Sequence, residues 1–317
     1  MRLKQLSRIM KLSPPKFLDP SIPRKRRIIS ERYMESDNAV VLPGIVEISE
    51  SGTCNRTCAF CPRSDPAYPD VKEFIEPGLL EKLARQLGEC GFSGLIIFSG
   101  FAEPLLDKKI FDKLALTKSI LPAARIEMIT NGDTLTPSVI ARLMESGLTT
   151  LLISVYDGPE DAERFAKMCK EDAGLEDDQY VIRNRFLPPE QDYGITMSNR
   201  GGMMDTTEHV RPALTEQLSE TCYYPSYMFF MDYQGDVLLC SHDWGKKYVV
   251  GNMKDQDFLD IWLSPPFMKA REQLNQGRRS LAPCQVCDVR GTLMGHDHAL
   301  GWAAHGGYKV QEPEEQP

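Results

Sequence analysis

The sequence lacks the long apolar runs that membrane-spanning proteins contain. No stretch of its 317 residues reaches the roughly 18 consecutive apolar residues that a transmembrane helix requires. The N-terminal stretch MRLKQLSRIMKLSPPKF alternates basic and apolar residues and lacks the apolar core and cleavage site of a signal peptide. We therefore expect a cytoplasmic protein without a membrane partner.

The chain is also poor in positive charge, with 37 Lys and Arg against 45 Asp and Glu and a net charge of −8. Proteins that bind nucleic acids present a basic face to the phosphates, and anionic membrane surfaces attract basic segments. The composition therefore argues against both partners and favours a small-molecule substrate.

Disulfide pairing is poorly supported, although the chain contains nine cysteines. The number is odd, and thiols stay reduced in the cytoplasm. Clustered cysteines in such a protein indicate metal or catalytic sites. Cys90 and Cys169 stand alone within predicted helices, where we expect small buried apolar residues. A hydrogen-atom donor is the alternative for either thiol.

Strands and helices alternate from residue 44 onward with short connections. Predicted strands cover 44–51, 94–100, 124–132, 149–158, 179–186 and 193–200, and predicted helices cover 77–91, about 107–120, 136–147 and 159–174. This alternation predicts parallel strands joined by right-handed crossovers. A closed eight-fold barrel typically needs about 250 residues. We therefore predict an α/β fold, a partial (β/α)6 barrel with its site at the carboxyl ends of the strands.

The remaining segments divide the chain further. We expect an irregular Pro-rich arm over 1–43, the barrel over 44–202, a linker over 203–221, a smaller unit over 222–290 and a disordered tail over 291–317. The arm contains a basic run, which suggests as an alternative a lip over an anionic ligand.

Three cysteines crowd into the stretch SGTCNRTCAFCPRSDP, residues 51–66. The spacing of Cys54, Cys58 and Cys61 suits one iron–sulfur cube held by a single loop, with one iron left open. A structural zinc site needs four protein ligands, so the zinc alternative requires a distant fourth residue.

A second set of four cysteines could supply every protein ligand of one metal site and leave no position open. It consists of Cys222, Cys240, Cys284 and Cys287. Both zinc and an iron–sulfur cluster accept four thiolates, so this pattern alone leaves the two open.

The first cysteine set resembles the signature of the radical SAM superfamily, with Phe60 just before the last cysteine. The stretch FSGFAEPLL (98–106) is similar to that family's Gly-Gly-Glu region, although Ala102 replaces a glycine. The resemblance covers residues 44 to about 200. It implies that a [4Fe–4S] cluster binds S-adenosylmethionine (SAM), which yields a 5′-deoxyadenosyl radical that removes a hydrogen atom from the substrate.

The resemblance also implies roles for single residues. Phe60 is expected near the adenine, and Glu103 with the Gly100 backbone is expected to contact the methionine amino group. Ser154 is expected at the ribose or carboxylate, and Asn131 on the same rim. For these two residues, turn capping is an equal alternative.

The second cysteine set resembles the auxiliary-cluster domain called SPASM in its short form, Twitch. This implies a second [4Fe–4S] cluster, ligated only by protein, that accepts an electron from a substrate radical. The short arrangement resembles radical SAM dehydrogenases of the butirosin type, which oxidise a secondary alcohol on an aminocyclitol. We therefore expect an oxidoreductase for a sugar, aminocyclitol or nucleotide sugar, with an external reductant such as flavodoxin or ferredoxin.

Arg200 is the candidate catalytic residue, because it precedes the auxiliary domain and should face the cavity between the clusters. Its high reference pKa favours positioning over proton removal, and an ordinary surface ion pair is the alternative. A peptide-modifying maturase, a radical epimerase and a non-enzymatic zinc adaptor remain as alternative functions.

Overall fold

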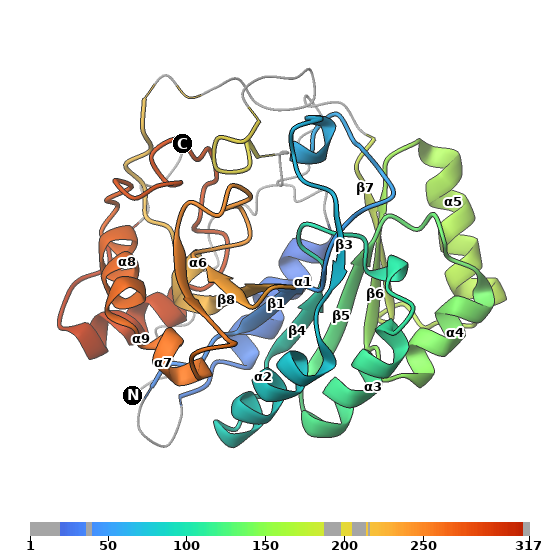
Figure 1. The fold of residues 1–317 in the computed structure, drawn as a ribbon, viewed down its shortest axis with the longest axis horizontal. Helices are drawn as coiled ribbons and strands as arrows, with labels where there is room; N and C mark the ends of the chain where they lie inside the picture. The colour runs from blue at the N-terminus through green and yellow to red at the C-terminus, as the bar shows by residue number, and fades with distance from the viewer. Residues whose placement is uncertain (1–19, 36–39, 187–197, 205–213, 215, 313–317) are drawn as a thin grey trace, which may run out of the picture.

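The computed structural model describes residues 20–35, 40–186, 198–204, 214 and 216–312. In this part of the chain, an eight-stranded sheet has the order β10-β9-β8-β1-β4-β5-β6-β7 (Figure 1). Its strands are β1 (Ile45–Ser49), β4 (Leu95–Phe98), β5 (Arg125–Thr130), β6 (Thr150–Val155), β7 (Tyr180–Asn184), β8 (Met228–Asp232), β9 (Asp236–Leu238) and β10 (Val249–Asn252). A separate antiparallel pair joins β2 (Ser51–Gly52) and β3 (Val71–Phe74).

Among the described residues, one helix precedes the first strand, and the other helices lie between the strands or after the last one. They are α1 (Ser21–Glu31), α2 (Pro77–Glu89), α3 (Ile110–Ile120), α4 (Pro137–Glu145), α5 (Pro159–Lys167), α6 (Tyr224–Tyr227), α7 (Phe258–Trp262), α8 (Pro265–Asn275) and α9 (His296–Gly306). Helix α4 begins as the sequence predicts, because the Thr136 side chain accepts a hydrogen bond from Val139 N at 3.2 Å. No helix in the described ranges has both the length and the apolar character needed to cross a bilayer.

The central part of the sheet is parallel, which confirms the predicted α/β class. Strand β1 pairs in parallel with both β4 and β8, and β4, β5, β6 and β7 continue the parallel order. Strands β9 and β10 add an antiparallel extension. The sheet is open, so the parallel strands form part of a barrel wall.

One strand differs from the sequence prediction. The strand beside β1 comes from Met228–Asp232, inside the expected C-terminal unit. The predicted strand at 193–200 lies outside the described residues up to 197, and Ser198–Arg200 are not in a strand. About half of the predicted linker at 203–221, residues 205–213 and 215, also lies outside them. The C-terminal unit therefore shares a sheet with the barrel segment.

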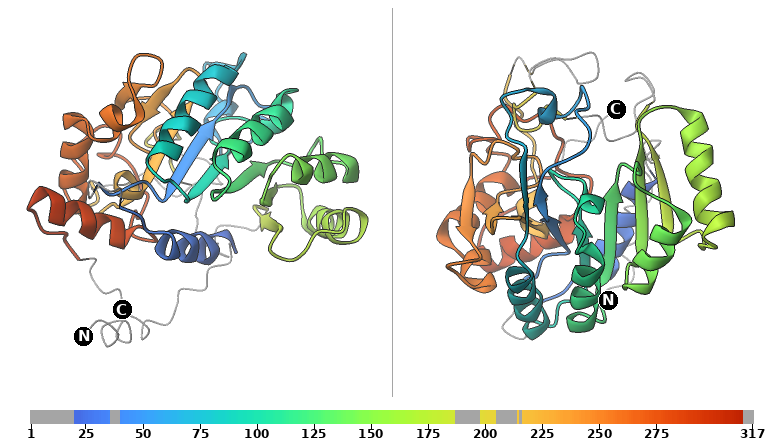
Figure 2. Two further views of the ribbon diagram at one scale, coloured as in Figure 1. Left: turned by 90° about the horizontal axis from the view of Figure 1, so that it is seen from below. Right: turned by 45° about the vertical axis from the view of Figure 1, so that its right-hand side comes forward.

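The two faces of the sheet are buried differently, because successive side chains of a strand alternate between faces. Val46 and Ile48 pack in one apolar cluster with residues of α2, α3, α4 and α5. Ile45 packs in a second cluster on the other face, which includes residues of α1. Figure 2 shows α1 on the side of the sheet opposite α2 and α3. This second face also carries buried polar side chains such as Glu47 and Ser99, which hydrogen-bond at 2.5 Å.

The expectation of an irregular arm over 1–43 is wrong for the segment that forms α1; residues 1–19 lie outside the described residues. Ile22, Ile28 and Ile29 are buried. Pro23 does not break the helix, because the first turn needs no intrahelical N–H donors. Arg24 bonds to the Glu127 side chain and to Thr150 Oγ1, which anchors α1 against β5 and β6.

The expectation of a disordered tail over 291–317 is wrong for 296–306, which form α9. Trp302 is fully buried, and its Nε1 donates a hydrogen bond to Ser226 O at 3.0 Å. The Gly- and His-rich composition obscured this helix, because its burial depends on α6 and α8, distant in sequence.

His298 of α9 makes the stability of the fold sensitive to acid. Its side chain is fully buried, and neither ring nitrogen has a hydrogen-bond partner among the described residues. Burial lowers its pKa from 6.5 to about 4, so stability is complete above pH 6.5 and falls as the pH drops towards 4. We expect His298→Leu to reduce the loss of unfolding free energy between pH 7.5 and 5.5 by about 1 kcal/mol.

Denaturant unfolding of both chains at the two pH values measures this difference. His305→Leu, at an exposed position of the same helix, is the matched control and should follow the unmodified chain. An equal acid loss in the His298→Leu chain would contradict the prediction.

Candidate functional site

The first three cysteines lie beyond the carboxyl end of β1, where the sequence places them. Cys54, Cys58 and Cys61 are free, half-buried thiols, and the turn between the last two is closed by Cys61 N donating to Cys58 O at 2.9 Å. The pKa of Cys58 is raised to about 11, mainly by burial and in part by the charges of Cys61 and Cys54. The three thiols thus lie near one another, as the ligands of one cluster must.

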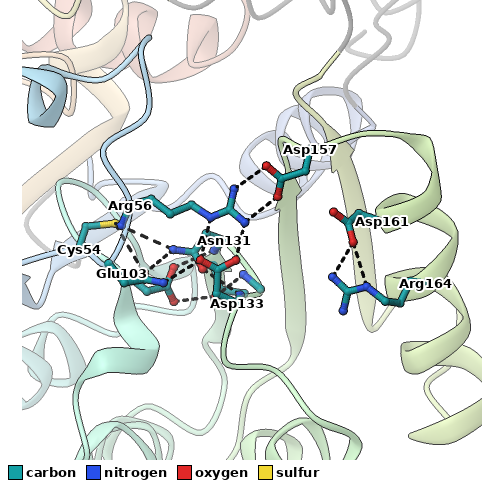
Figure 3. A network of polar contacts seen from close by, with 11 residues as sticks. Cys54, Arg56, Glu103, Asn131, Asp133, Asp157, Asp161 and Arg164 are labelled. Atoms are coloured by element: carbon teal, nitrogen blue, oxygen red, sulfur yellow. Dashed lines mark hydrogen bonds and ion pairs between the residues drawn. The ribbon is translucent and has the colours of Figure 1, made fainter.

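Arg56, inside this loop, fastens it to the ends of two neighbouring strands (Figure 3). Its Nε donates to Asp133 Oδ2 at 2.8 Å, and its Nη2 to Asp157 Oδ2 at 2.7 Å. Asp133 follows β5 and Asp157 follows β6. Hydrogen bonding from Arg56 is the main reason that the pKa of Asp133 is lowered. The ion pairs therefore hold the cysteine loop over this edge of the sheet.

Glu103 lies beneath the loop and is 2% exposed. One carboxylate oxygen accepts from Thr130 Oγ1 at 2.6 Å and from Leu105 N at 3.1 Å, and the other accepts from Asn131 N at 2.7 Å. Burial raises its pKa, while these donors lower it. In this arrangement Glu103 orders the end of β5, and its contact with a methionine amino group stays a prediction.

Asn131 connects Glu103 to the cysteine loop. Its side-chain nitrogen donates to Asn55 Oδ1 at 2.7 Å and lies 4.0 Å from Cys54 Sγ. The Asn55 side chain in turn donates to Asp133 at 2.7 Å. The predicted rim residue thus lies within the same network as Arg56.

Of the other predicted cofactor residues, Gly100 follows β4, Ser154 lies near the end of β6, and Phe60 lies in the cysteine loop. Phe60 packs against Tyr156 with ring centroids 5.2 Å apart. Ser154 Oγ accepts from Arg183 Nη1 at 3.4 Å. Gly100 has a φ of +87°, and a Cβ there would lie 2.7 Å from the Ser49 side chain, so this turn requires glycine.

The second cysteine set surrounds one cavity. Cys222, Cys240, Cys284 and Cys287 are all buried, and all line the cavity together with Tyr224, His242 and Arg279. Burial is the main cause that raises the pKa of Cys287 to about 12. Across the described residues, no group of three or more His, Cys, Asp or Glu is arranged to hold a single metal ion. Four thiols around a hollow fit a cluster of several iron atoms.

Gly291 allows Cys222 to reach this cavity. A Cβ at Gly291 would lie 2.2 Å from Cys222 Sγ, and Gly291 O accepts from Tyr223 N at 2.9 Å. Sequence reasoning missed this glycine because the contact joins residues distant in the chain. Cys169 is fully buried as expected, and Cys90 is half-buried at the end of α2.

Arg200 lies close to the same region. Its guanidinium carbon is 5.7 Å from the centroid of the Trp244 ring, and its buried Nε has no hydrogen-bond partner among the described residues. Its φ of 51° is uncommon for a residue other than glycine. Strained conformations of this kind concentrate at functional sites. This geometry permits Arg200 to position a substrate, and that role stays a prediction.

A hydrogen-bonded chain missed by sequence reasoning runs beside Arg200. His242 Nδ1 lies 3.0 Å from Ser198 Oγ, and its Nε2 lies 3.2 Å from Tyr224 Oη. Burial, assisted by the charges of Arg200 and Arg279, lowers the pKa of His242 to about 3. The imidazole is therefore neutral near pH 7.

Comparison with known proteins adds two sequence families. Residues 48–178 match the radical SAM superfamily, and residues 222–288 match the SPASM iron–sulfur cluster-binding domain. The S-adenosyl-L-methionine-dependent 2-deoxy-scyllo-inosamine dehydrogenase of Niallia circulans is 29% identical over 245 residues, which cover 77% of this chain and 92% of that protein.

Two solved structures of BtrN are similar to this one. The complex of BtrN with AdoMet and 2-DOIA has a TM-score of 0.68 and 28% identity, covering 83% of this chain and 99% of that one. The open conformation of BtrN has a TM-score of 0.57 and 26% identity, covering 78% and 93%.

Proposed function

Because this chain belongs to the radical SAM superfamily and carries a SPASM-type cluster domain, we propose that it oxidises a secondary alcohol of an aminocyclitol. The observation that carries this proposal is the pair of distinct cysteine sites, one with three thiols and one with four. The similarity to a 2-deoxy-scyllo-inosamine dehydrogenase supports the substrate class. A small polar molecule of related structure, such as a sugar or nucleotide sugar, fits the same chemistry.

The residues present fit the expected groups. We assign Cys54, Cys58 and Cys61 to a SAM-binding [4Fe–4S] cluster, and we assign Cys222, Cys240, Cys284 and Cys287 to an auxiliary [4Fe–4S] cluster. When bound, these groups supply a radical that removes a hydrogen atom from the substrate and an acceptor for one electron.

The chain's own residues bind and orient. We propose that Phe60, the Gly100 backbone and Ser154 contact SAM, while Asn131 and Glu103 hold the rim on which it rests. Arg200 would hold the substrate hydroxyl by donating hydrogen bonds, because a guanidinium that stays protonated is a poor proton acceptor. The reacting carbon would thereby be aimed at the loop of the three cysteines.

We further propose an electron donor, a cellular location and domain boundaries for this protein. A flavodoxin or ferredoxin would supply the external electron, and a cytoplasmic location would keep the seven ligand thiols reduced. The boundaries expected from the sequence, 44–202 for the barrel and 222–290 for the cluster domain, contain the two matched segments.

Anaerobic reconstitution followed by a labelling experiment tests the function. The reconstituted protein should hold close to eight iron per chain, as two four-iron clusters require. With 2-deoxy-scyllo-inosamine deuterated at its carbinol carbons, one deuterium should appear in 5′-deoxyadenosine for each ketone formed.

Two outcomes would contradict the proposal. Solvent deuterium entering an otherwise unchanged aminocyclitol would identify an epimerase. Two tightly bound zinc ions without iron would remove the radical chemistry altogether.

A further inference from the structure

Among the described residues, the buried Arg279 side chain has only neutral hydrogen-bond partners. It is 1% exposed, although it lies only four residues beyond the end of α8. Its guanidinium donates to three backbone carbonyl oxygens, those of Glu220 at 2.8 Å, Val289 at 3.0 Å and Thr221 at 3.3 Å. Among the described residues no carboxylate lies within ion-pair distance of it. Within the described part of the chain, this side chain is therefore held by backbone dipoles.

This cation lines the cavity of the four thiols. Among the described residues that line the cavity, Arg279 is the only arginine or lysine. The Cys284 and Cys287 thiols line the same cavity.

Two buried carboxylates lie in the same region. Asp243 lies three positions after Cys240, and Asp288 directly follows Cys287. Asp243 accepts from Lys247 N and Tyr248 N, and Asp288 accepts from Asn199 N. Arg279 therefore stands against a local excess of negative charge once the thiols are deprotonated.

Such a residue has an electrostatic consequence for the site. Burying a charge without an opposite charge is unfavourable, so a buried arginine indicates that negative charge is to be placed beside it. A cluster with four thiolate ligands is anionic, and its negative charge grows by one when it accepts an electron. A fixed neighbouring cation stabilises the reduced form more than the oxidised form.

We propose that Arg279 raises the reduction potential of the four-thiolate site and so makes that site an electron acceptor. The inference rests on the proposed function, in which one electron leaves the substrate radical while its hydroxyl proton is released to a base. In this proposal Arg279 changes the reduction potential through its charge, without contacting substrate or SAM.

The test measures the potential of the auxiliary site by itself. The full chain carrying Cys54→Ala, Cys58→Ala and Cys61→Ala is reconstituted, and its cluster is titrated with reductant under electron paramagnetic resonance. In this background Arg279→Gln should lower the equilibrium constant for reduction at least tenfold, a fall of 59 mV for one electron. Arg279→Lys, which keeps the charge, should stay within about threefold of the parent.

Arg278→Gln is the matched control. Arg278 is the neighbouring residue, but its side chain is 54% exposed and lies 3.6 Å from Glu272. Its removal should leave the potential unchanged, because water screens an exposed charge. If the Arg279→Gln chain does not hold iron, the potential is measured on Arg279→His instead. Its potential should rise as the pH falls from 8 to 6, more steeply than that of the parent.

The outcomes separate this inference from the function. A glutamine chain with four iron and the parental potential would overturn it, as would equal shifts in the glutamine and lysine chains. A histidine chain with the parental pH dependence would overturn it too. Absence of iron from the parental auxiliary site would instead remove the proposed function.

Discussion

Replacing Gly291 with valine is expected to empty the C-terminal cysteine site of iron and to leave the N-terminal site loaded. Even a single Cβ would lie 2.2 Å from Cys222 Sγ and 2.8 Å from Cys222 Cα. The backbone cannot move away cheaply, because Gly291 O holds Tyr223 N. Because the clash involves the Cys222 backbone as well as its sulfur, both the ligand and the cavity wall that carries it would be displaced, and the cluster would not assemble there.

Iron analysis and turnover measure this effect. The valine chain should hold about half the iron of the parent, since one of two four-iron sites is lost. It should still cleave SAM but form no ketone. Gly78→Ala is the matched control, because no atom lies within 4 Å of a Cβ at this helical position. A Gly291→Val chain with full iron would show that the site tolerates the displacement.

Replacing Arg56 with methionine is expected to slow SAM cleavage about 100-fold while the first site keeps its iron. Arg56 is not one of the three proposed cluster ligands, so iron can still bind. The cysteine loop, however, loses its bonds to Asp133 and Asp157. A displacement of about 1 Å in an active site costs roughly this factor in rate. Formation of 5′-deoxyadenosine and iron content are measured together.

Arg164→Met provides the control for Arg56→Met. Arg164 forms a similar ion pair with Asp161 at 2.7 Å, and Figure 3 shows this pair apart from the cysteine loop. Its removal should leave the rate unchanged, because exposed pairs contribute little. Equal rates in the Arg56→Met chain and the parent would mean that the loop is held by its backbone alone.

Local signals in the sequence account for much of the fold. The Thr136–Pro137 pair marks the start of α4, because the cap and the proline act within one turn. The short apolar runs at Leu95–Phe98 and Thr150–Val155 become fully buried strands. The spacing of the cysteines likewise divides seven of them into a set of three and a set of four, and the structure places the four around one cavity.

The missed features depend on contacts between distant residues. Arg56 and Asp157 are separated by 101 positions, and no local pattern indicates that they pair. Helices α1 and α9 have weak local signals and are stabilised by burial of Ile29 and Trp302. Arg279 resembles any other charged residue in the sequence, and only its burial beside the thiols distinguishes it.

The parallel pairing of β8 with β1 has a consequence for how this protein is assembled. Strand β1 leads into the first cysteine loop, and β8 comes from the segment that carries the second set. The C-terminal segment is therefore no detachable module, since without it β1 would be an exposed edge strand prone to aggregation. Both cysteine sites are attached to one continuous sheet, so the distance between them is fixed by the hydrogen-bonded backbone.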